Sequence, residues 1–217
     1  MMIRVFIADD HAIVRDGLRF ILSAQPDIEV VGEAANGREA VRQVEQLCPD
    51  VVLMDISMPE LNGIEAAQQI RERCPATQVV MLSVHSTGEH VFRALQAGAK
   101  GYLLKESASA EVIDAVREVH AGHRHLSAKI VDFLAERYVH PEQFAGAESP
   151  LAQLSPRERE VLQLIAEGKS SAEIARVLAL SPATVDTYRS RLMRKLGLTD
   201  LVGLIKFAIQ HGLTPLE

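Results

Sequence analysis

The stretch Val51-Val52-Leu53-Met54-Asp55 decides the fold of this 217-residue chain. Its four apolar residues stand between Pro49 and Pro59 and predict a strand buried on both faces, as in a parallel sheet. In open α/β sheets, ligands bind outside the carboxyl ends of the strands, so we expect Asp55 to lie at a functional site. Taken alone, the same stretch also fits an aspartate that only begins a turn.

Similar strands and helical patterns alternate on both sides of this stretch. Short apolar segments at 3–8, 28–31, 79–82 and 101–104 predict four further strands. Apolar residues at helical spacing predict helices over 11–22, 37–47, 61–73, 89–97 and 110–120. Five alternating strand–helix units indicate a flavodoxin-like (βα)5 domain, a doubly wound parallel sheet with right-handed crossovers.

Polar residues follow four of these strands. Asp9 and Asp10 follow the first strand, Asp55 ends the central one, and Ser83 and Lys105 follow the two strands after it. Parallel strands end at one edge of a sheet, so we expect these side chains to cluster. Mg²⁺ would relieve the repulsion among the three carboxylates. Asp55 is then a nucleophile able to form an aspartyl-phosphate, with Lys105 and Ser83 binding the phosphoryl oxygens.

Over residues 3–122, this pattern resembles the receiver domain of two-component response regulators. The resemblance implies that Asp9 and Asp10 are the metal-binding acidic pair and that Asp55 is the phosphoacceptor. It also implies that Ser83 is the switch hydroxyl and that Lys105 is the lysine typical of that family.

The same resemblance implies roles for two further residues. The backbone carbonyl of Ser57 would complete the metal ligands, and Tyr102 would be the aromatic residue that moves inward on activation. The chain departs from many receivers at Glu106, where they have proline, which puts a cis peptide bond there in doubt.

Simpler readings exist for several of these residues. Asp9 and Asp10 also fit an N-cap pair for the next helix, and Tyr102 also fits a surface position on a strand.

The histidines of this half also have alternative interpretations. His85 fits a loop histidine that tunes hydrolysis of the acyl phosphate, or one with no such role. The spacing of His120, His123 and His125 fits no common zinc pattern, so we predict a plain loop for them.

Composition separates the chain into two parts. Residues 1–150 carry a formal charge of −8 and residues 151–217 a charge of +2, within a total of −6, which suggests different partners for the two halves. No apolar run approaches the roughly 18–20 residues of a membrane span. The two cysteines have no partners at metal-ligand spacing, and the chain starts without a signal-peptide pattern. We therefore expect a cytoplasmic protein without a membrane partner.

The sequence patterns also predict the domain boundaries. We expect a receiver domain over 1–122, a linker over 123–150 with a helix at about 127–139, and a helical domain over 151–217. In the last part, Ser155, Pro156 and Glu158 form a capping-box pattern that begins a helix. Three further helices are predicted at 171–178, 182–196 and about 200–210.

Two of these helices, joined by a tight turn, predict a helix-turn-helix. The segment 151–212 resembles the LuxR-type DNA-binding domain, and with the receiver it resembles the NarL/FixJ class of response regulators. The DNA-binding residues implied are Thr184, Asp186, Thr187, Tyr188, Arg189, Ser190, Arg191, Arg194 and Lys195. Many members have lysine where this chain has Asp186. The aspartate could accept a hydrogen bond from cytosine N4, or it could simply lower non-specific affinity. The last helix offers Leu201, Leu204, Ile205 and Ala208 as dimer contacts.

These observations predict a transcription factor that is switched by Mg²⁺-dependent phosphorylation of Asp55. The expected partners are a sensor histidine kinase, promoter DNA, a second copy of the chain and RNA polymerase. We expect no enzymatic activity beyond phosphoryl transfer to itself and slow self-dephosphorylation. One alternative is a phosphohydrolase, which leaves the helix-turn-helix unexplained. The other is a DNA-binding protein whose receiver never meets a kinase.

Overall fold

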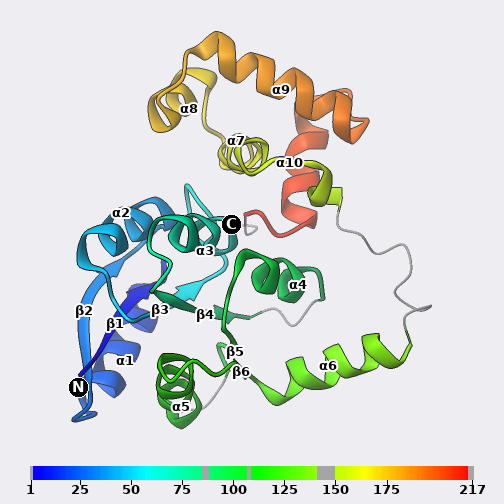
Figure 1. Cartoon of the computed structure of the whole chain (residues 1–217). Helices are drawn as coiled ribbons and strands as arrows, with labels where there is room; N and C mark the ends of the chain where they lie inside the picture. Colours follow the sequence, from blue (N-terminus) through cyan, green and yellow to red (C-terminus); the bar gives the residue numbers. More distant parts are fainter. Residues whose placement is uncertain (1, 85–87, 107–108, 141–149, 215–217) are drawn as a thin grey trace. The chain divides into compact units, whose positions relative to one another are not determined.

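The computed structural model describes residues 2–84, 88–106, 109–140 and 150–214, which form two compact units (Figure 1). The first unit holds the sheet and ends with the helix α6, Ala128–Val139. The second unit is helical, and its first helical element is the 3-10 helix Pro150–Gln153.

In the first unit, strands and helices alternate along the chain. The strands are β1 Ile3–Ala8, β2 Ile28–Ala34, β3 Val51–Asp55, β4 Gln78–Ser83, β5 Gly101–Leu104 and β6 His125–Leu126. The helices before α6 are α1 Ala12–Ser23, α2 Gly37–Leu47, α3 Gly63–Arg73, α4 Gly88–Ala97 and α5 Ser109–His120.

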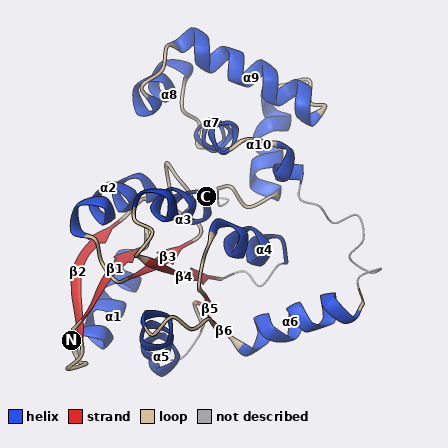
Figure 2. Cartoon of the chain, viewed as in Figure 1, coloured by secondary structure: helices blue, strands red, loops and turns tan. Residues whose placement is uncertain are grey.

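All strands pair in parallel, in the order β2-β1-β3-β4-β5-β6. Helices α1 and α5 cover one face of the sheet, and α2, α3 and α4 cover the other (Figure 2). The central strand β3 is buried along its whole length, because helices lie against both of its faces. This confirms the doubly wound α/β fold that the alternating pattern predicts.

One element differs from the prediction. His125, which the sequence assigns to a plain loop, forms the two-residue strand β6 with Leu126, and they pair with Gly101 and Tyr102 of β5. A strand of two residues is too short to show an alternating pattern, so the sequence carries no signal for it.

The helix α6 packs against α4 through aromatic contacts. The guanidinium carbon of Arg137 lies 3.9 Å from the centre of the Phe92 ring. A methyl group added to Gly88, the first residue of α4, would lie 2.1 Å from the Phe133 ring. A side chain at this position would have to displace the Phe133 ring, so α6 packs closely against α4.

The second unit contains α7 Pro156–Ala166, α8 Ser171–Leu178, α9 Pro182–Leu196 and α10 Leu201–Gln210. The predicted capping box is confirmed, since the Ser155 side chain accepts from the Glu158 backbone and the Glu158 side chain accepts from the Ser155 backbone. Ser170 and Glu173 form a second capping box at the start of α8. Apolar residues of all four helices form one core, which includes Ile174, Val185 and Leu204.

Candidate functional site

A cluster of acidic side chains lies at the carboxyl ends of β1 and β3. Asp9 is completely buried, Asp55 is 2 % exposed, and Asp10 lies between them in sequence. One ligand atom from each, together with a ring nitrogen of His11, falls within a group whose atoms are all within 4.8 Å of one another. The structure thus brings the three predicted carboxylates together.

The loop after β3 holds Asp55 in place through close backbone packing. The Gly63 amide donates to the Ile56 carbonyl, and a methyl group added to Gly63 would lie 1.9 Å from the Asp55 carbonyl oxygen. Asn62 is buried, and its side chain accepts from the backbone amides of Ile64 and Glu65 to cap α3. The chain therefore needs a residue without a side chain next to the nucleophile.

Lys105 bridges two of the carboxylates. Its ammonium lies 2.8 Å from Asp9 Oδ2 and 2.9 Å from Asp55 Oδ2. Burial raises the pKa of Asp55, the carboxylates of Asp9 and Asp10 raise it further, and Lys105 opposes this shift. Burial disfavours the charge of Lys105, but the two carboxylates outweigh burial and raise the pKa of the ammonium above its usual value. A positive charge is thus fixed beside the nucleophile.

Ser83 and Tyr102 lie side by side in neighbouring strands. Tyr102 pairs with Met81 in the sheet, so Tyr102 and Ser83 lie on the same face, and their side chains share a hydrogen bond. Tyr102 is completely buried, and burial raises the pKa of its hydroxyl to about 12. The structure therefore shows the inward position of this aromatic residue and excludes a surface position.

The donor atoms of the cluster fit a hard divalent cation. Asp10 Oδ1 is buried and accepts no hydrogen bond from a described residue, and the buried Asp9 Oδ2 and Asp55 Oδ2 share the single Lys105 ammonium. Three crowded carboxylates around one ammonium leave negative charge that a further cation would neutralise. Carboxylate and carbonyl oxygens are the ligands that Mg²⁺ prefers, and Ser57 lies half-buried two residues after Asp55.

The second unit presents a polar helix face. On α9, the side chains of Asp186, Thr187, Ser190, Arg191 and Arg194 are exposed, whereas Val185 and Leu192 are buried in the core. The exposed residues are spaced three or four apart and therefore share one face. A helix of this kind, preceded by α8 and a tight turn, has the geometry that enters a major groove.

Other residues of the predicted DNA-binding set have partners within the unit. Lys195 lies 2.7 Å from Glu158 Oε2, and Arg189 donates to the Ser171 hydroxyl, which in turn donates to Asp186. Although burial opposes it, the Lys195 contact lowers the pKa of Glu158. Thr184 and Tyr188 are half-buried. Arg191 and Arg194 are the exposed cations of the predicted set that have no such contact among the described residues.

The two halves of the chain each match a protein family. Residues 5–117 match the family described as response regulator receiver domain, and residues 152–208 match bacterial regulatory proteins of the luxR family. The chain belongs to the NarL/FixJ class of two-component response regulators.

Individual relatives agree with this assignment over the full length of the response regulator. This chain is 44% identical to the uncharacterized transcriptional regulatory protein YhcZ of Bacillus subtilis, over 97% of both chains. It is 41% identical to the response regulator UvrY of Escherichia coli, over 100% of this chain and 98% of UvrY. A solved structure of two RcsB dimers bound to two parallel DNAs is 27% identical, with a TM-score of 0.59, over 95% of this chain and 98% of that one.

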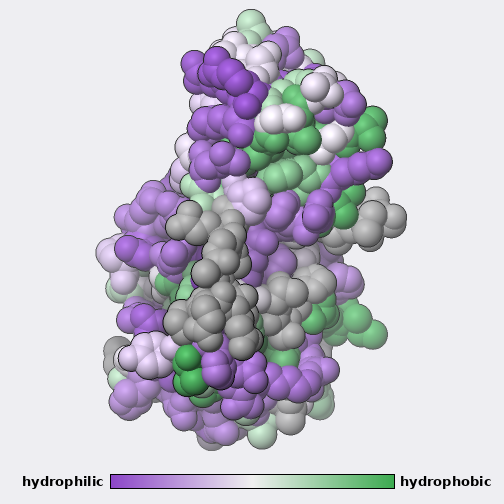
Figure 3. Space-filling view, turned by 90° about the vertical axis from the view of Figure 1, so that its right-hand side faces the viewer, coloured by the Kyte–Doolittle hydropathy of each residue, from purple (hydrophilic) through white to green (hydrophobic). Residues whose placement is uncertain are grey.

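The predicted dimer contacts of this response regulator need a correction. Leu204 and Ala208 are completely buried in the core of their own unit, so neither can contact a second chain while the unit stays folded. Ile205 also packs against this core. Leu201, with 41% exposure, stays a predicted contact, and its neighbour Val202 is 57% exposed. Hydrophobic side chains reach the surface of both units among hydrophilic ones (Figure 3).

Sequence reasoning missed three residues of the receiver site. Asn62 and Gly63 support the nucleophile from the end of the loop after β3, and an Asn-Gly pair at the start of a predicted helix was the available signal. His11 lies beside Asp10, and its signal was a histidine at a helix N-cap, where shorter polar residues are favoured. His85, by contrast, lies outside the described residues.

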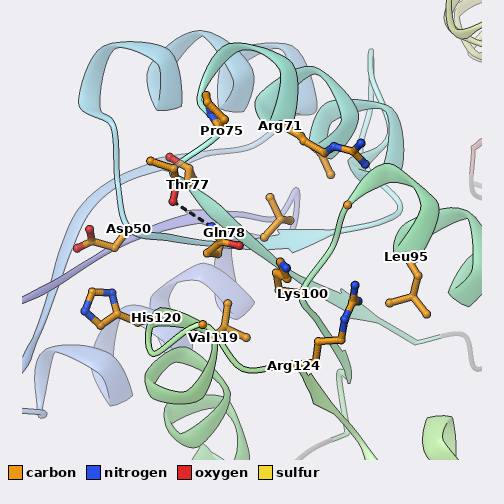
Figure 4. A pocket seen from close by; sticks show the side chains of 15 residues that line it. Asp50, Arg71, Pro75, Thr77, Gln78, Leu95, Lys100, Val119, His120 and Arg124 are labelled. Atoms are coloured by element: carbon orange, nitrogen blue, oxygen red, sulfur yellow. Dashed lines mark hydrogen bonds between the residues drawn. The ribbon is translucent and has the colours of Figure 1, made fainter.

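A separate cavity of about 720 Å³ lies at the amino edge of the sheet (Figure 4). Asp50, Arg71, Lys100 and Arg124 are among the residues that line it. Arg71 donates to the Gln96 carbonyl and Arg124 to the Ala99 carbonyl, near the end of α4. Cations are favourable at the carboxyl ends of helices, so these contacts explain the two arginines without a ligand.

Within the described residues, no helix has the length and apolar composition to cross a membrane.

Proposed function

We propose that this response regulator controls transcription and is switched by phosphorylation of Asp55 by a sensor histidine kinase. One observation carries the proposal: a nearly buried carboxylate ends the central strand between the Lys105 ammonium and two further carboxylates. Among the described residues, no second group of carboxylate, histidine or cysteine ligand atoms lies as close together. The switch would act in the cytoplasm on promoter DNA, with RNA polymerase as a further partner.

In the proposed reaction, a carboxylate oxygen of Asp55 attacks the phosphorus atom of a phosphohistidine. The P–N bond breaks, an O–P bond forms, and the imidazole nitrogen keeps the electron pair. Lys105 pairs with a phosphoryl oxygen and balances its charge. When bound, Mg²⁺ supplies positive charge to the crowded carboxylates, with Asp9, Asp10, Asp55 and the Ser57 carbonyl as the protein ligands. Beyond this transfer and slow self-dephosphorylation, we propose no enzymatic activity.

The response to phosphorylation would begin at Ser83. Ser83 ends β4, whose Leu82 pairs with Asp55, and its hydroxyl shares a hydrogen bond with the buried Tyr102. A phosphoryl group on Asp55 offers new acceptor oxygens, and Ser83 would donate to one of them. The two neighbouring side chains would then shift together and bias the receiver between two states.

The output of the switch would be dimerisation and operator binding. The exposed face of α9 has the polar and cationic residues that read base edges and phosphates. The related RcsB is described as dimers bound to DNA, which supports the same output for this chain. Bringing two DNA-binding units together raises affinity through effective concentration.

The test compares the full chain, Asp55→Asn and Asp16→Asn, each with and without a small-molecule phosphodonor and Mg²⁺. Asp16 is an exposed residue of α1 and provides a matched control. We expect a phosphorylated species by intact mass, together with gains in dimer fraction and DNA binding, in the wild type and Asp16→Asn alone. Equal mass, dimer fraction and DNA affinity in all samples would support the alternative of a receiver that never takes a phosphoryl group.

A further inference from the structure

His11 stands at the start of α1 without acting as its cap. Its side chain makes no capping hydrogen bond, although the N-cap position is where a side chain normally satisfies the first backbone amides. The ring instead turns to the acidic cluster. Nδ1 lies 2.7 Å from Asp10 Oδ1 and 3.3 Å from Asp9 Oδ1, while 62% of the side chain stays exposed.

The distance between Nδ1 and Asp10 does not reflect a well-oriented hydrogen bond. Asp10 Oδ1 is buried and accepts no such bond from any described residue, whereas Asp9 Oδ2 and Asp55 Oδ2 have the Lys105 ammonium at 2.8 and 2.9 Å. A ring nitrogen of His11 and one oxygen from each of the three carboxylates all lie within 4.8 Å of one another. Adjacent ligand atoms of an octahedral ion with bonds of about 2.1 Å lie about 3 Å apart, and the 2.7 Å between Nδ1 and Asp10 Oδ1 is close to that value. Asp9 Oδ1, 3.3 Å from Nδ1, already accepts from the His11 backbone amide.

We propose that His11 Nδ1 is a fifth protein ligand of the metal site and shifts its preference toward late first-row divalent metals. Imidazole suits Ni²⁺, Zn²⁺ and Fe²⁺, whereas carboxylates and carbonyls suit Mg²⁺. A receiver site made of oxygen ligands alone has no nitrogen ligand to favour these metals over Mg²⁺. The inference rests on the metal site proposed above and concerns which ion that site takes.

The test is a calorimetric titration of the full-length protein with Ni²⁺ and, separately, with Mg²⁺. The variants are His11→Ala and, as a matched control, His123→Ala, which removes an exposed histidine that lies outside the cluster. We expect His11→Ala to weaken Ni²⁺ binding at least ~10-fold and Mg²⁺ binding less than ~2-fold. His123→Ala should change neither affinity at this site.

A spectroscopic measurement identifies the ligand directly. With Mn²⁺ bound, electron spin-echo envelope modulation should show a coordinated imidazole nitrogen in the wild type and in His123→Ala, but not in His11→Ala. Equal losses for Ni²⁺ and Mg²⁺, or no loss for either, would overturn the inference, as would a nitrogen signal that persists in His11→Ala. If Mg²⁺ does not bind the wild type, the proposed metal site itself is wrong. If Mg²⁺ binds the wild type but His11→Ala does not change the affinity for Ni²⁺, only this inference fails.

Discussion

At the scale of single residues, the buried charge of Asp55 is a source of instability. Burial raises the pKa of this carboxyl, so the folded chain holds the proton more tightly than the unfolded chain. The contribution of Asp55 to the free energy of unfolding should therefore fall as pH rises from the unfolded pKa of about 3.9 to the raised folded value, and stay level above it.

Asp55→Asn should remove this dependence and stabilise the metal-free protein at neutral pH by about 1 kcal/mol. Urea denaturation in the presence of a chelator, measured between acid and neutral pH, gives the difference between variant and wild type. Asp16→Asn, which changes an exposed carboxylate, should show no such pH-dependent gain. A wild type as stable as Asp55→Asn at neutral pH would mean that Lys105 fully compensates the buried charge.

Gly63 presents the opposite case, a residue that is needed because it has no side chain. An alanine methyl at this position would lie 1.9 Å from the Asp55 carbonyl oxygen, and neither backbone segment can move without displacing the nucleophile. We expect Gly63→Ala to destabilise the receiver by about 3 kcal/mol, as overpacking does, and to slow phosphorylation of Asp55.

Gly17 is a matched control for this substitution. It lies in α1, is exposed, and has no atom within 4 Å of the position of an added methyl. Gly17→Ala should stabilise the protein by about 0.5–1 kcal/mol, because it restricts the unfolded chain and suits a helix. Denaturation curves and phosphorylation rates of the two variants separate a local collision from a general effect of glycine replacement.

At the scale of elements, α9 allows a quantitative prediction for DNA binding. Each phosphate contact contributes about 0.9 to the slope of log affinity against log salt, because bound counterions are released. Arg191→Ala and Arg194→Ala should each weaken binding and lower this slope by about one phosphate contact. Lys206→Ala removes an exposed cation from α10 and should leave the slope unchanged. An unchanged slope in both arginine variants would exclude this face as the phosphate-binding surface.

The elements also show how far the sequence alone reaches. The five longer strands of the receiver and the capping box at Ser155 follow from local patterns, and the structure confirms them. β6 does not, because its two residues acquire their strand geometry only by pairing with β5. Leu204 and Ala208 were assigned to a dimer contact because an apolar helix face does not reveal what covers it. The core of their own unit covers them.

The candidate site shows the same limit at close range. The carboxylates and Lys105 could be placed together because parallel strands end at one edge, a rule that depends on topology alone. The position of the His11 ring and the lack of room for a methyl group at Gly63 depend on side-chain directions and distances of a few ångströms. The inward position of Tyr102 likewise involves a hydrogen bond to Ser83 in the neighbouring strand β4, and no spacing along the chain predicts this bond.

At the scale of the whole molecule, the two parts of the chain differ in net charge and therefore in their expected interaction with DNA. Residues 1–150 carry −8 and would repel DNA, whereas residues 151–217 carry only +2. With so small a positive charge and few exposed cations on α9, a single DNA-binding unit should bind weakly. Useful affinity would then require two units on one operator, which makes dimerisation the natural step to control.

This reasoning predicts how phosphorylation depends on the DNA that is offered. On DNA with two half-sites, phosphorylated protein should bind ~10- to 100-fold more tightly than unphosphorylated protein, because the second unit binds at a high effective concentration. On DNA with a single half-site, the change should be less than ~2-fold, since each unit makes the same contacts in both states. Fluorescence anisotropy with the two DNAs measures both affinities, and Asp55→Asn should show neither change. An equal gain on both DNAs would mean that phosphorylation changes the DNA-binding unit itself, because effective concentration cannot act on a single half-site.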